Sequence, residues 1–156
     1  MATAFATNVP DPQTNVRGEF VQIVQLLATA AAGVYTISVP AGCLIQEVSA
    51  VITEAFNGTA PLIKIGDPDD DDGYLTSAII APATALTTTA PAVKRSYSAT
   101  SATAFEFGKY YPTASTINVD YALTTASTTG KCIIVVKGIR VDRHGVPAGL
   151  LNTAVL

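Results

Sequence analysis

Residues 116–124 alternate between apolar and polar side chains more regularly than any other stretch of this sequence. The apolar members of the pattern are Ile117, Val119, Tyr121 and Leu123. A period of two residues places alternate side chains on opposite faces of a β-strand, so this stretch predicts a strand with one buried face. A chain with many such strands must pack each sheet against a second layer, which leaves few possible architectures.

Similar patterns recur along the chain, separated by turn signals that contain glycine, proline and asparagine. Strands are expected over residues 34–39, 44–56, 62–65, 74–80, 93–98, 104–111 and 131–141. Residues 19–27 fit either a strand or the start of a short helix. One face of the 44–56 strand is expected to carry Leu44, Val48, Ala50, Ile52 and Phe56. The pattern predicts an all-β chain, a jelly-roll-like β-sandwich of about eight strands.

The distribution of the strand patterns predicts three parts. Residues 1–18 are expected to form an extended N-terminal arm, residues 19–141 the sandwich, and residues 142–156 a C-terminal tail with an apolar end. The arm shows no period, so it is either a frayed terminus or a segment that becomes ordered against a partner.

The composition points to a surface that is partly covered. Hydrophobic residues make up 49% of the chain and charged residues only 13%, whereas about 25% is typical of soluble domains. We therefore expect part of the surface to contact a partner or further copies of the chain. The net charge of −3 argues against nucleic acid as a ligand, because phosphate binding needs clustered basic residues.

Export and membrane insertion are not expected. The first residues lack a basic segment followed by an apolar one, so they do not resemble a signal peptide. The uncharged stretch 20–46 is long enough to span a bilayer, but glutamine, glycine and proline interrupt it.

Cys43 and Cys132 both adjoin strand-like apolar residues. We expect two buried thiols. A disulfide between them stays open, because the sequence does not fix their distance.

An acidic run occupies residues 67–72 and is interrupted only by Pro68. The alternate spacing of Asp67, Asp69 and Asp71 could place oxygen ligands around Ca²⁺. The glycine and the glutamate of an EF-hand loop are missing at the required positions. A turn that lies in solvent is the preferred interpretation, so no cofactor is expected.

Catalytic signatures are not found in the sequence. His144 is the sole histidine, and no nucleophile elbow, zinc-ligand set or glycine-rich phosphate loop accompanies it. We therefore predict that the protein is not an enzyme.

Several strand-and-turn stretches carry a family resemblance: residues 40–42, 51–58, 63–67, 72–75, 107–111, 116–123 and 130–141. They resemble small structural proteins of tailed bacteriophages, in particular head decoration (cement) proteins with a jelly-roll domain. The resemblance implies a virion protein made in the host cytoplasm. It also implies a homotrimer on the outer surface of the capsid, where it clamps neighbouring subunits of the major capsid protein.

The resemblance assigns no contact residues, so candidates are taken from the sequence pattern itself. In the arm, Phe5, Val9 and Arg17 are expected to reach a neighbouring capsid subunit. The continuously apolar run Ile133, Ile134, Val135 and Val136 is the candidate trimer interface. Its alternative is ordinary burial of a central strand on both faces.

A second hypothesis is a trimeric receptor- or glycan-binding module of a phage tail or fibre. It would place the site on loops 67–73 and 81–103, and sugar rings would stack on tyrosines such as Tyr97, Tyr110 and Tyr111.

Overall fold

The computed structural model describes residues 5–8, 19–84, 93–95 and 108–141, which form nine β-strands and one short helix. The strands are β1 (Phe5–Asn8), β2 (Glu19–Leu27), β3 (Gly33–Val39), β4 (Cys43–Glu54), β5 (Leu62–Gly66), β6 (Val93–Arg95), β7 (Lys109–Tyr111), β8 (Ser115–Ala122) and β9 (Lys131–Arg140). The helix α1 spans Ser77–Ile80. Residues 19–27, which fitted either a strand or the start of a short helix, form the strand β2.

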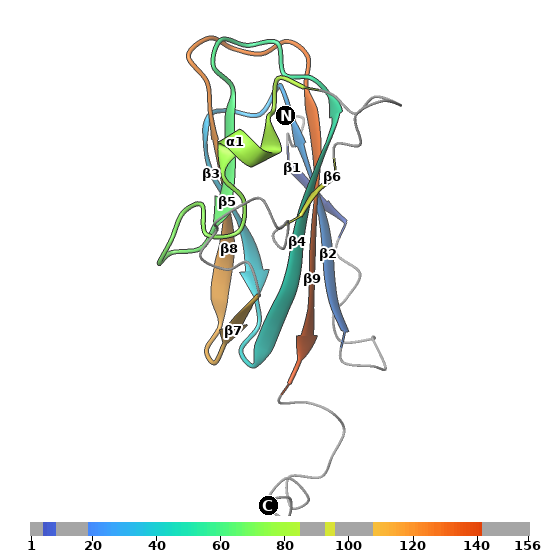
Figure 1. Cartoon of the computed structure of the whole chain (residues 1–156), viewed down its shortest axis with the longest axis vertical. Coiled ribbons are helices and arrows are strands. Elements are labelled where there is room, and N and C mark those ends of the chain that lie inside the picture. The colour runs from blue at the N-terminus through green and yellow to red at the C-terminus, as the bar shows by residue number, and fades with distance from the viewer. Residues whose placement is uncertain (1–4, 9–18, 85–92, 96–107, 142–156) are drawn as a thin grey trace, which may run out of the picture.

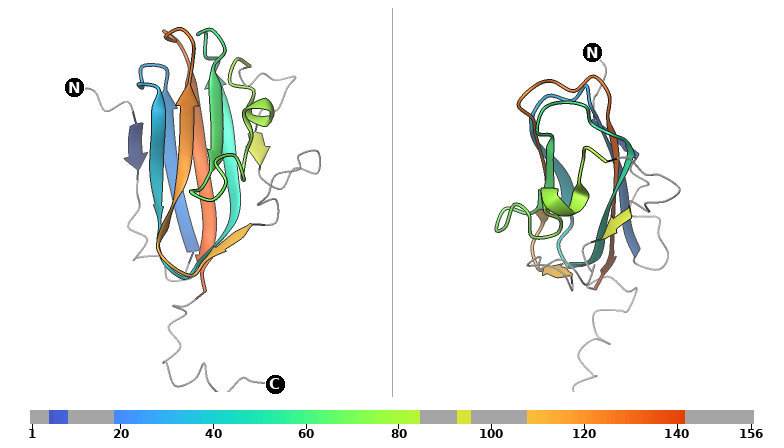
Figure 2. Two further views of the ribbon diagram at one scale, coloured as in Figure 1. Left: turned by 90° about the vertical axis from the view of Figure 1, so that its left-hand side faces the viewer. Right: turned by 45° about the horizontal axis from the view of Figure 1, so that its top comes forward.

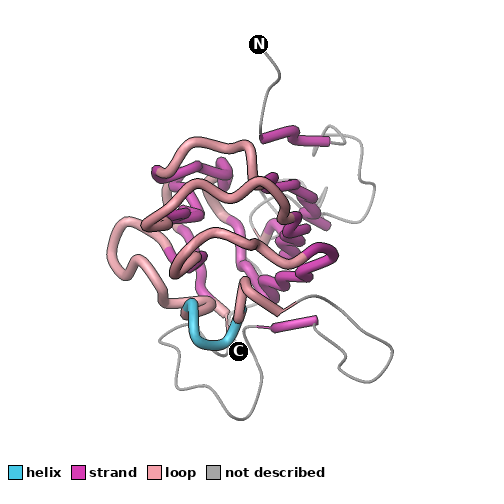
Figure 3. The backbone as a smooth tube through the Cα atoms, turned by 90° about the horizontal axis from the view of Figure 1, so that it is seen from above, coloured by secondary structure: helices cyan, strands magenta, loops and turns pink. Residues whose placement is uncertain are grey.

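The strands form two antiparallel sheets that pack face to face (Figure 1). The large sheet has the order β1-β2-β9-β4-β6, with β7 also paired to β4, and the small sheet has the order β3-β8-β5. From β2 to β5, and again from β7 to β9, successive strands belong to opposite sheets, as in a jelly roll. Figure 3 looks down on the loops that join the two layers at one end. The predicted jelly-roll-like sandwich is confirmed.

The core lies between the inner faces of the two sheets. β9 contributes Cys132, Ile134 and Val136, and β8 contributes Ile117, Val119 and Tyr121. The rings of Phe56 and Tyr121 lie 5.5 Å apart, centroid to centroid. Full burial of one large apolar side chain, such as Ile134 or Ile117, stabilises the fold by about 1.5–3 kcal/mol relative to leaving it exposed.

The face predicted for β4 is partly wrong. The register of β4 against β9 shifts between Ile45 and Glu47, so an extra residue interrupts the alternation there. A shift of one residue moves every later side chain to the opposite face. As a result Ile45 and Val48 are both buried, and Leu44, which was expected to share the core face with Val48, is only half-buried.

The strand predicted over residues 74–80 is wrong. Leu75 makes a single antiparallel bridge to Ile65, and the chain then turns into α1. The hydroxyl of Thr76 accepts a hydrogen bond from the amide of Ile79 at 3.3 Å and caps the helix. No helix among the described residues has the length and apolar character needed to cross a membrane.

The two cysteines lie at opposite ends of the β4–β9 pair. Cys43 is in register with Arg140, and Cys132 with Ile52. The strand rise places the two ends about 27 Å apart, far beyond the reach of a disulfide. Neither cysteine is in a disulfide and both are buried, as expected from the sequence, and burial raises the pKa of the Cys132 thiol to about 12.

Candidate functional site

The outer face of the large sheet carries apolar side chains across its three central strands. Ile23 of β2 lies beside Val135 of β9, and Ile133 of β9 lies beside Val51 of β4. Ile23 is 45% exposed, and the other three are half-buried. A sheet face that meets only water normally carries polar side chains. We call these four residues the outer stripe.

Charged residues flank the outer stripe at both ends along the strands. On one side the ammonium of Lys137 lies 3.8 Å from the carboxylate of Glu47, which also accepts a hydrogen bond from the hydroxyl of Ser49. On the other side Lys131 is in register with Glu54. An apolar centre with a polar, charged rim is the usual anatomy of a protein–protein contact.

The structure divides the four residues predicted to form the trimer interface. Ile134 and Val136 are 0% exposed and belong to the core, so for these two side chains the prediction is wrong. The strict alternation of β9 sends every second side chain inward. Ile133 and Val135 lie in the outer stripe and stay candidates. Sequence reasoning missed Ile23 and Val51, because only the strand register brings them beside β9.

The arm residues are only partly within the described structure. Phe5 lies in β1, which pairs with the edge of β2 so that Phe5 is in register with Leu26. Val9 and Arg17 lie outside the described residues. Part of the expected arm is therefore an edge strand of the large sheet, and contact between the arm and a capsid subunit stays a prediction.

The acidic loop, residues 66–73, is built around the side chain of Asp67, which is fully buried. One carboxylate oxygen accepts hydrogen bonds from two backbone amides of the loop, at 3.0 and 3.1 Å. The other accepts from the hydroxyl of Tyr111 at 2.8 Å and from the ammonium of Lys109 at 2.5 Å. These contacts fasten the loop to β7.

Hydrogen bonds keep the buried carboxylate ionised. Burial alone would raise the pKa of Asp67, but the bonds from Lys109, Tyr111 and the two amides outweigh it, and the pKa lies below its ordinary value. The hydroxyls of Tyr111 and Tyr74 lie 3.0 Å apart. Burial raises the pKa of both tyrosines, so their hydroxyls stay protonated. Both oxygens of the Asp67 carboxylate already have donors, as expected of a carboxylate with a structural role.

The three predicted calcium ligands do not converge. Lys109 neutralises Asp67 and also reaches Asp69 at 2.8 Å, and Asp71 pairs with Lys64. Each of these carboxylates faces a lysine, so the calcium hypothesis for Asp67, Asp69 and Asp71 is wrong. Asp69 and Asp71 are exposed, as predicted for a loop that lies in solvent, whereas Asp67 is buried.

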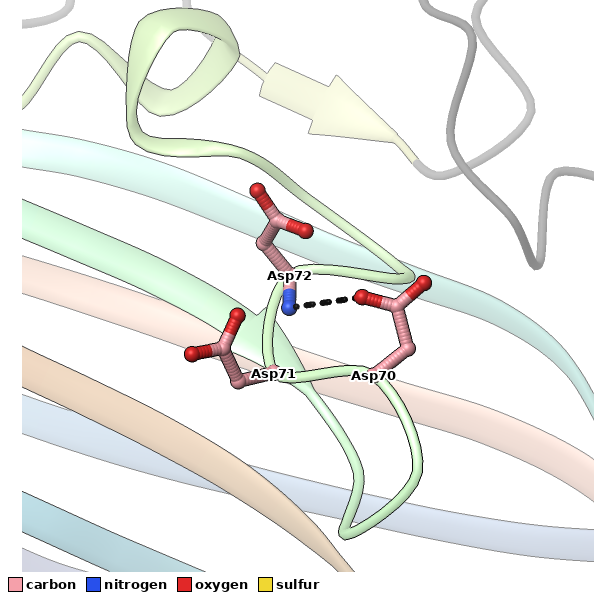
Figure 4. A group of neighbouring side chains, drawn as sticks. All are labelled: Asp70, Asp71 and Asp72. Carbon is pink, nitrogen blue, oxygen red and sulfur yellow. Dashed lines mark hydrogen bonds between the residues drawn. The ribbon is translucent and has the colours of Figure 1, made fainter.

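A different acidic group occurs at the tip of the loop. Asp70, Asp71 and Asp72 bring one carboxylate oxygen each within 4.8 Å of one another (Figure 4). The amide of Asp72 donates to the carboxylate of Asp70 at 3.4 Å. Burial and the neighbouring Asp70 raise the pKa of Asp72. Asx-type hydrogen bonds of this kind are ordinary turn chemistry.

The residues considered for sugar binding and catalysis are not assembled within the described structure. Tyr111 is buried, and its hydroxyl donates a hydrogen bond to the carboxylate of Asp67. Tyr110 is 49% exposed. Tyr97 and His144 lie outside the described residues.

Comparison with known proteins finds likeness in structure but not in sequence. No protein-family model and no curated protein matches the chain. A chain of the cyanophage Pam1 capsid asymmetric unit matches with a TM-score of 0.53 and 12% identity, over 78% of this chain and 84% of that one. A chain of the acid-stable capsid structure of Helicobacter pylori bacteriophage KHP30 matches with a TM-score of 0.54 and 13% identity, over 86% and 92%. At these identities the likeness shows a shared fold.

Proposed function

We propose that the chain is a structural protein of a phage virion, a decoration or cement protein that binds the outside of a phage head. It would stabilise contacts between major capsid subunits and would have no catalytic role. The observation that carries the proposal is the outer stripe with its charged rim, which has the anatomy of a contact surface. The fold shared with chains of two phage capsid structures supports the choice of partner.

In this proposal three copies associate through the outer stripe. Ile133 and Val135 of one copy contact the neighbouring copy, and the arm with Phe5, Val9 and Arg17 reaches the capsid. A protein that binds only the assembled shell stabilises it by mass action, because binding lowers the free energy of the assembled state alone.

Binding to phage heads tests this function. Purified protein is titrated into expanded heads that lack it, the heads are pelleted, and the bound fraction is measured. We expect saturable binding and a higher temperature of head disruption when the protein is bound. Heads that neither bind the protein nor gain thermal stability would contradict the proposal.

A pair of deletions separates the arm from the sandwich. Removal of residues 1–18 is expected to abolish binding to heads while the circular dichroism spectrum keeps its β character. Removal of residues 1–4 is the matched control, because it leaves β1 in place against β2. Unchanged binding after the longer deletion would exclude a role for the arm.

A further inference from the structure

The strands at the sheet edges are protected in different ways. The large sheet ends in very short strands, β1 with 4 residues and β6 with 3, and short edge strands resist pairing with other chains. The small sheet ends in β5 on one side and in the 7-residue strand β3 on the other. Among the described residues, no strand pairs with the outer edge of β3.

The outer edge of β5 is closed by the chain that follows it. The amide of Ile65 donates to the carbonyl of Leu75 at 2.8 Å, and the amide of Leu75 donates back at 2.9 Å. The amide of Ile63 donates to the hydroxyl of Ser77 at 3.2 Å. The outward-pointing amides at positions 63 and 65 of β5 therefore have partners.

The register shows which amides of β3 point outward. Ile63 and Ile65 direct their amides away from β8. The residue between them, Lys64, therefore directs its backbone amide and carbonyl toward β8, where they pair with the backbone of Asp120. A residue of a central antiparallel strand directs its hydrogen-bonding groups to one neighbour only. Val34, which faces Asp120 from the other side, must therefore direct its amide and carbonyl outward.

The same alternation points the backbone groups of Thr36 and Ser38 outward. An independent contact agrees: the side chain of Gln22 in β2 donates to the carbonyl of Ser38 at 3.3 Å. This leaves the outward-pointing groups of Val34 and Thr36 with no partner among the described residues. Both residues are exposed, so these backbone groups face water and form the kind of unpaired edge to which a further strand can add.

The edge of β3 also lacks the usual features that prevent strand addition. Its sequence, Gly-Val-Tyr-Thr-Ile-Ser-Val, contains no charge and no proline, and Val34 is 59% exposed. Natural proteins place lysine, proline or a bulge at such edges, or cover them. The strand is therefore suited to accept another extended segment.

We propose that residues 150–156 of the same chain add to β3 as a fourth, antiparallel strand of the small sheet. The amide of Val141, the last described residue, donates to the carbonyl of Gly42 at 2.8 Å. Gly42 follows closely after Val39, the end of β3, so residues 142–156 leave the described structure beside the foot of the open edge. A strand that starts there and runs along β3 is antiparallel, as are all strand pairs here.

Length and composition fit this occupant. Residues 142–149 contain Gly145, Pro147 and Gly149, which favour a turn, and can span up to about 27 Å. Residues 150–156, Leu-Leu-Asn-Thr-Ala-Val-Leu, are uncharged like β3 and equal it in length. In the large sheet β1 already projects beyond β3 (Figure 2), so one added strand would extend the small sheet to a similar breadth. The inference does not depend on the proposed function.

Amide hydrogen exchange tests the proposal. In the intact chain the amides of Val34 and Thr36 are expected to exchange at least about ten-fold more slowly than in a chain that ends at Val141. The amide of Ile37, which faces β8, is the internal control and should change little. In the full-length chain, the double substitution Thr153→Pro and Ala154→Pro should release the protection of Val34 and Thr36, because one of two successive amides faces β3 in either register and proline cannot donate to a ladder. Ala148→Pro, outside the added strand, is the matched control and should not.

Three results would overturn the proposal. Rapid exchange of Val34 and Thr36 in the intact chain would show an open edge. Slow exchange that survives both the truncation and the double proline substitution would show that another segment covers the edge. Protection that is lost on dilution would show that a second copy supplies the strand. The two proline variants keep the test valid if the truncated chain does not fold.

Discussion

The outer faces of the two sheets differ, although their inner faces share one apolar core. On the small sheet the ammonium of Lys64 lies 3.5 Å from the carboxylate of Asp120, and the exposed Thr36 stands beside Asn118 in the register. On the large sheet the corresponding central positions form the outer stripe. Both sheets obey the same alternation, so alternation accounts for the core but not for this difference.

Under the proposed function, the polar face of the small sheet meets water and the outer stripe meets protein. The polar face of the small sheet satisfies its charges within itself. The outer stripe consists of apolar side chains, and burying apolar surface yields about 25 cal/mol for each Å² removed from water. In a chain with only 13% charged residues, the outer stripe thus groups four apolar side chains on the outer face of the large sheet, although Val34 on β3 of the small sheet is exposed as well.

The largest effect on the free energy of unfolding is expected in β9, where neighbouring side chains point to opposite faces of the sheet. Ile134→Ala should lower the free energy of unfolding by about 2–5 kcal/mol, because it leaves a cavity in the core. Ile133→Ala, the same substitution on the outer stripe, should cost the isolated chain less than about 1 kcal/mol. Urea unfolding at low protein concentration measures both. Equal losses would mean that the outer stripe belongs to the fold and not to an interface.

The next effect concerns the acidic loop beside the small sheet. Asp67→Asn should cost about 1–3 kcal/mol, because Lys109 and Tyr111 lose a charged acceptor. The folded pKa of Asp67 lies below its ordinary value of 3.8. Its contribution is therefore present above about pH 4 and is lost as the pH falls through the folded pKa. Thermal unfolding from pH 6 to pH 2 should show a shallower acid dependence in the variant; parallel curves would contradict this role.

The predictable and unpredictable parts of the molecule differ in physical origin. The alternation of residues 116–124 and the turn signals between the strand patterns are local, and they predict the sandwich correctly. The side chains of Ile45 and Val48 both point into the core because the register of β4 against β9 shifts between them. This shift depends on the pairing with β9, so the sequence of β4 alone does not predict it. The helix capped by Thr76 was missed, because the apolar residues around it also fit a strand.

The candidate site was less predictable than the fold. The apolar run on β9 contains Ile133 and Val135 of the outer stripe, but it does not separate them from the core residues Ile134 and Val136. Its partners Ile23 and Val51 come from β2 and β4, and no local pattern links them. The burial of Asp67 likewise depends on Lys109 and Tyr111, which lie far away in sequence and meet the loop only in the folded chain.

The smallest effect is expected for the exposed ion pair on the small sheet. Asp71→Asn removes one partner of Lys64, but Asp120 remains within reach. Exposed pairs of this kind contribute about 0–1 kcal/mol. The change in unfolding free energy should stay in that range and shrink further in high salt. A loss well above it would show that the small sheet depends on this charge.

The solution mass of the protein, measured by light scattering over a wide range of protein concentration, decides whether the outer stripe is an interface between copies. We expect a trimer for the parental chain. We expect a folded monomer for Val135→Lys, which places a charge in the outer stripe, and an intact trimer for Asn118→Lys on the polar face of the small sheet. A parental chain that is monomeric at every concentration, or a trimer that Val135→Lys leaves intact, would contradict the assignment of the outer stripe as the interface.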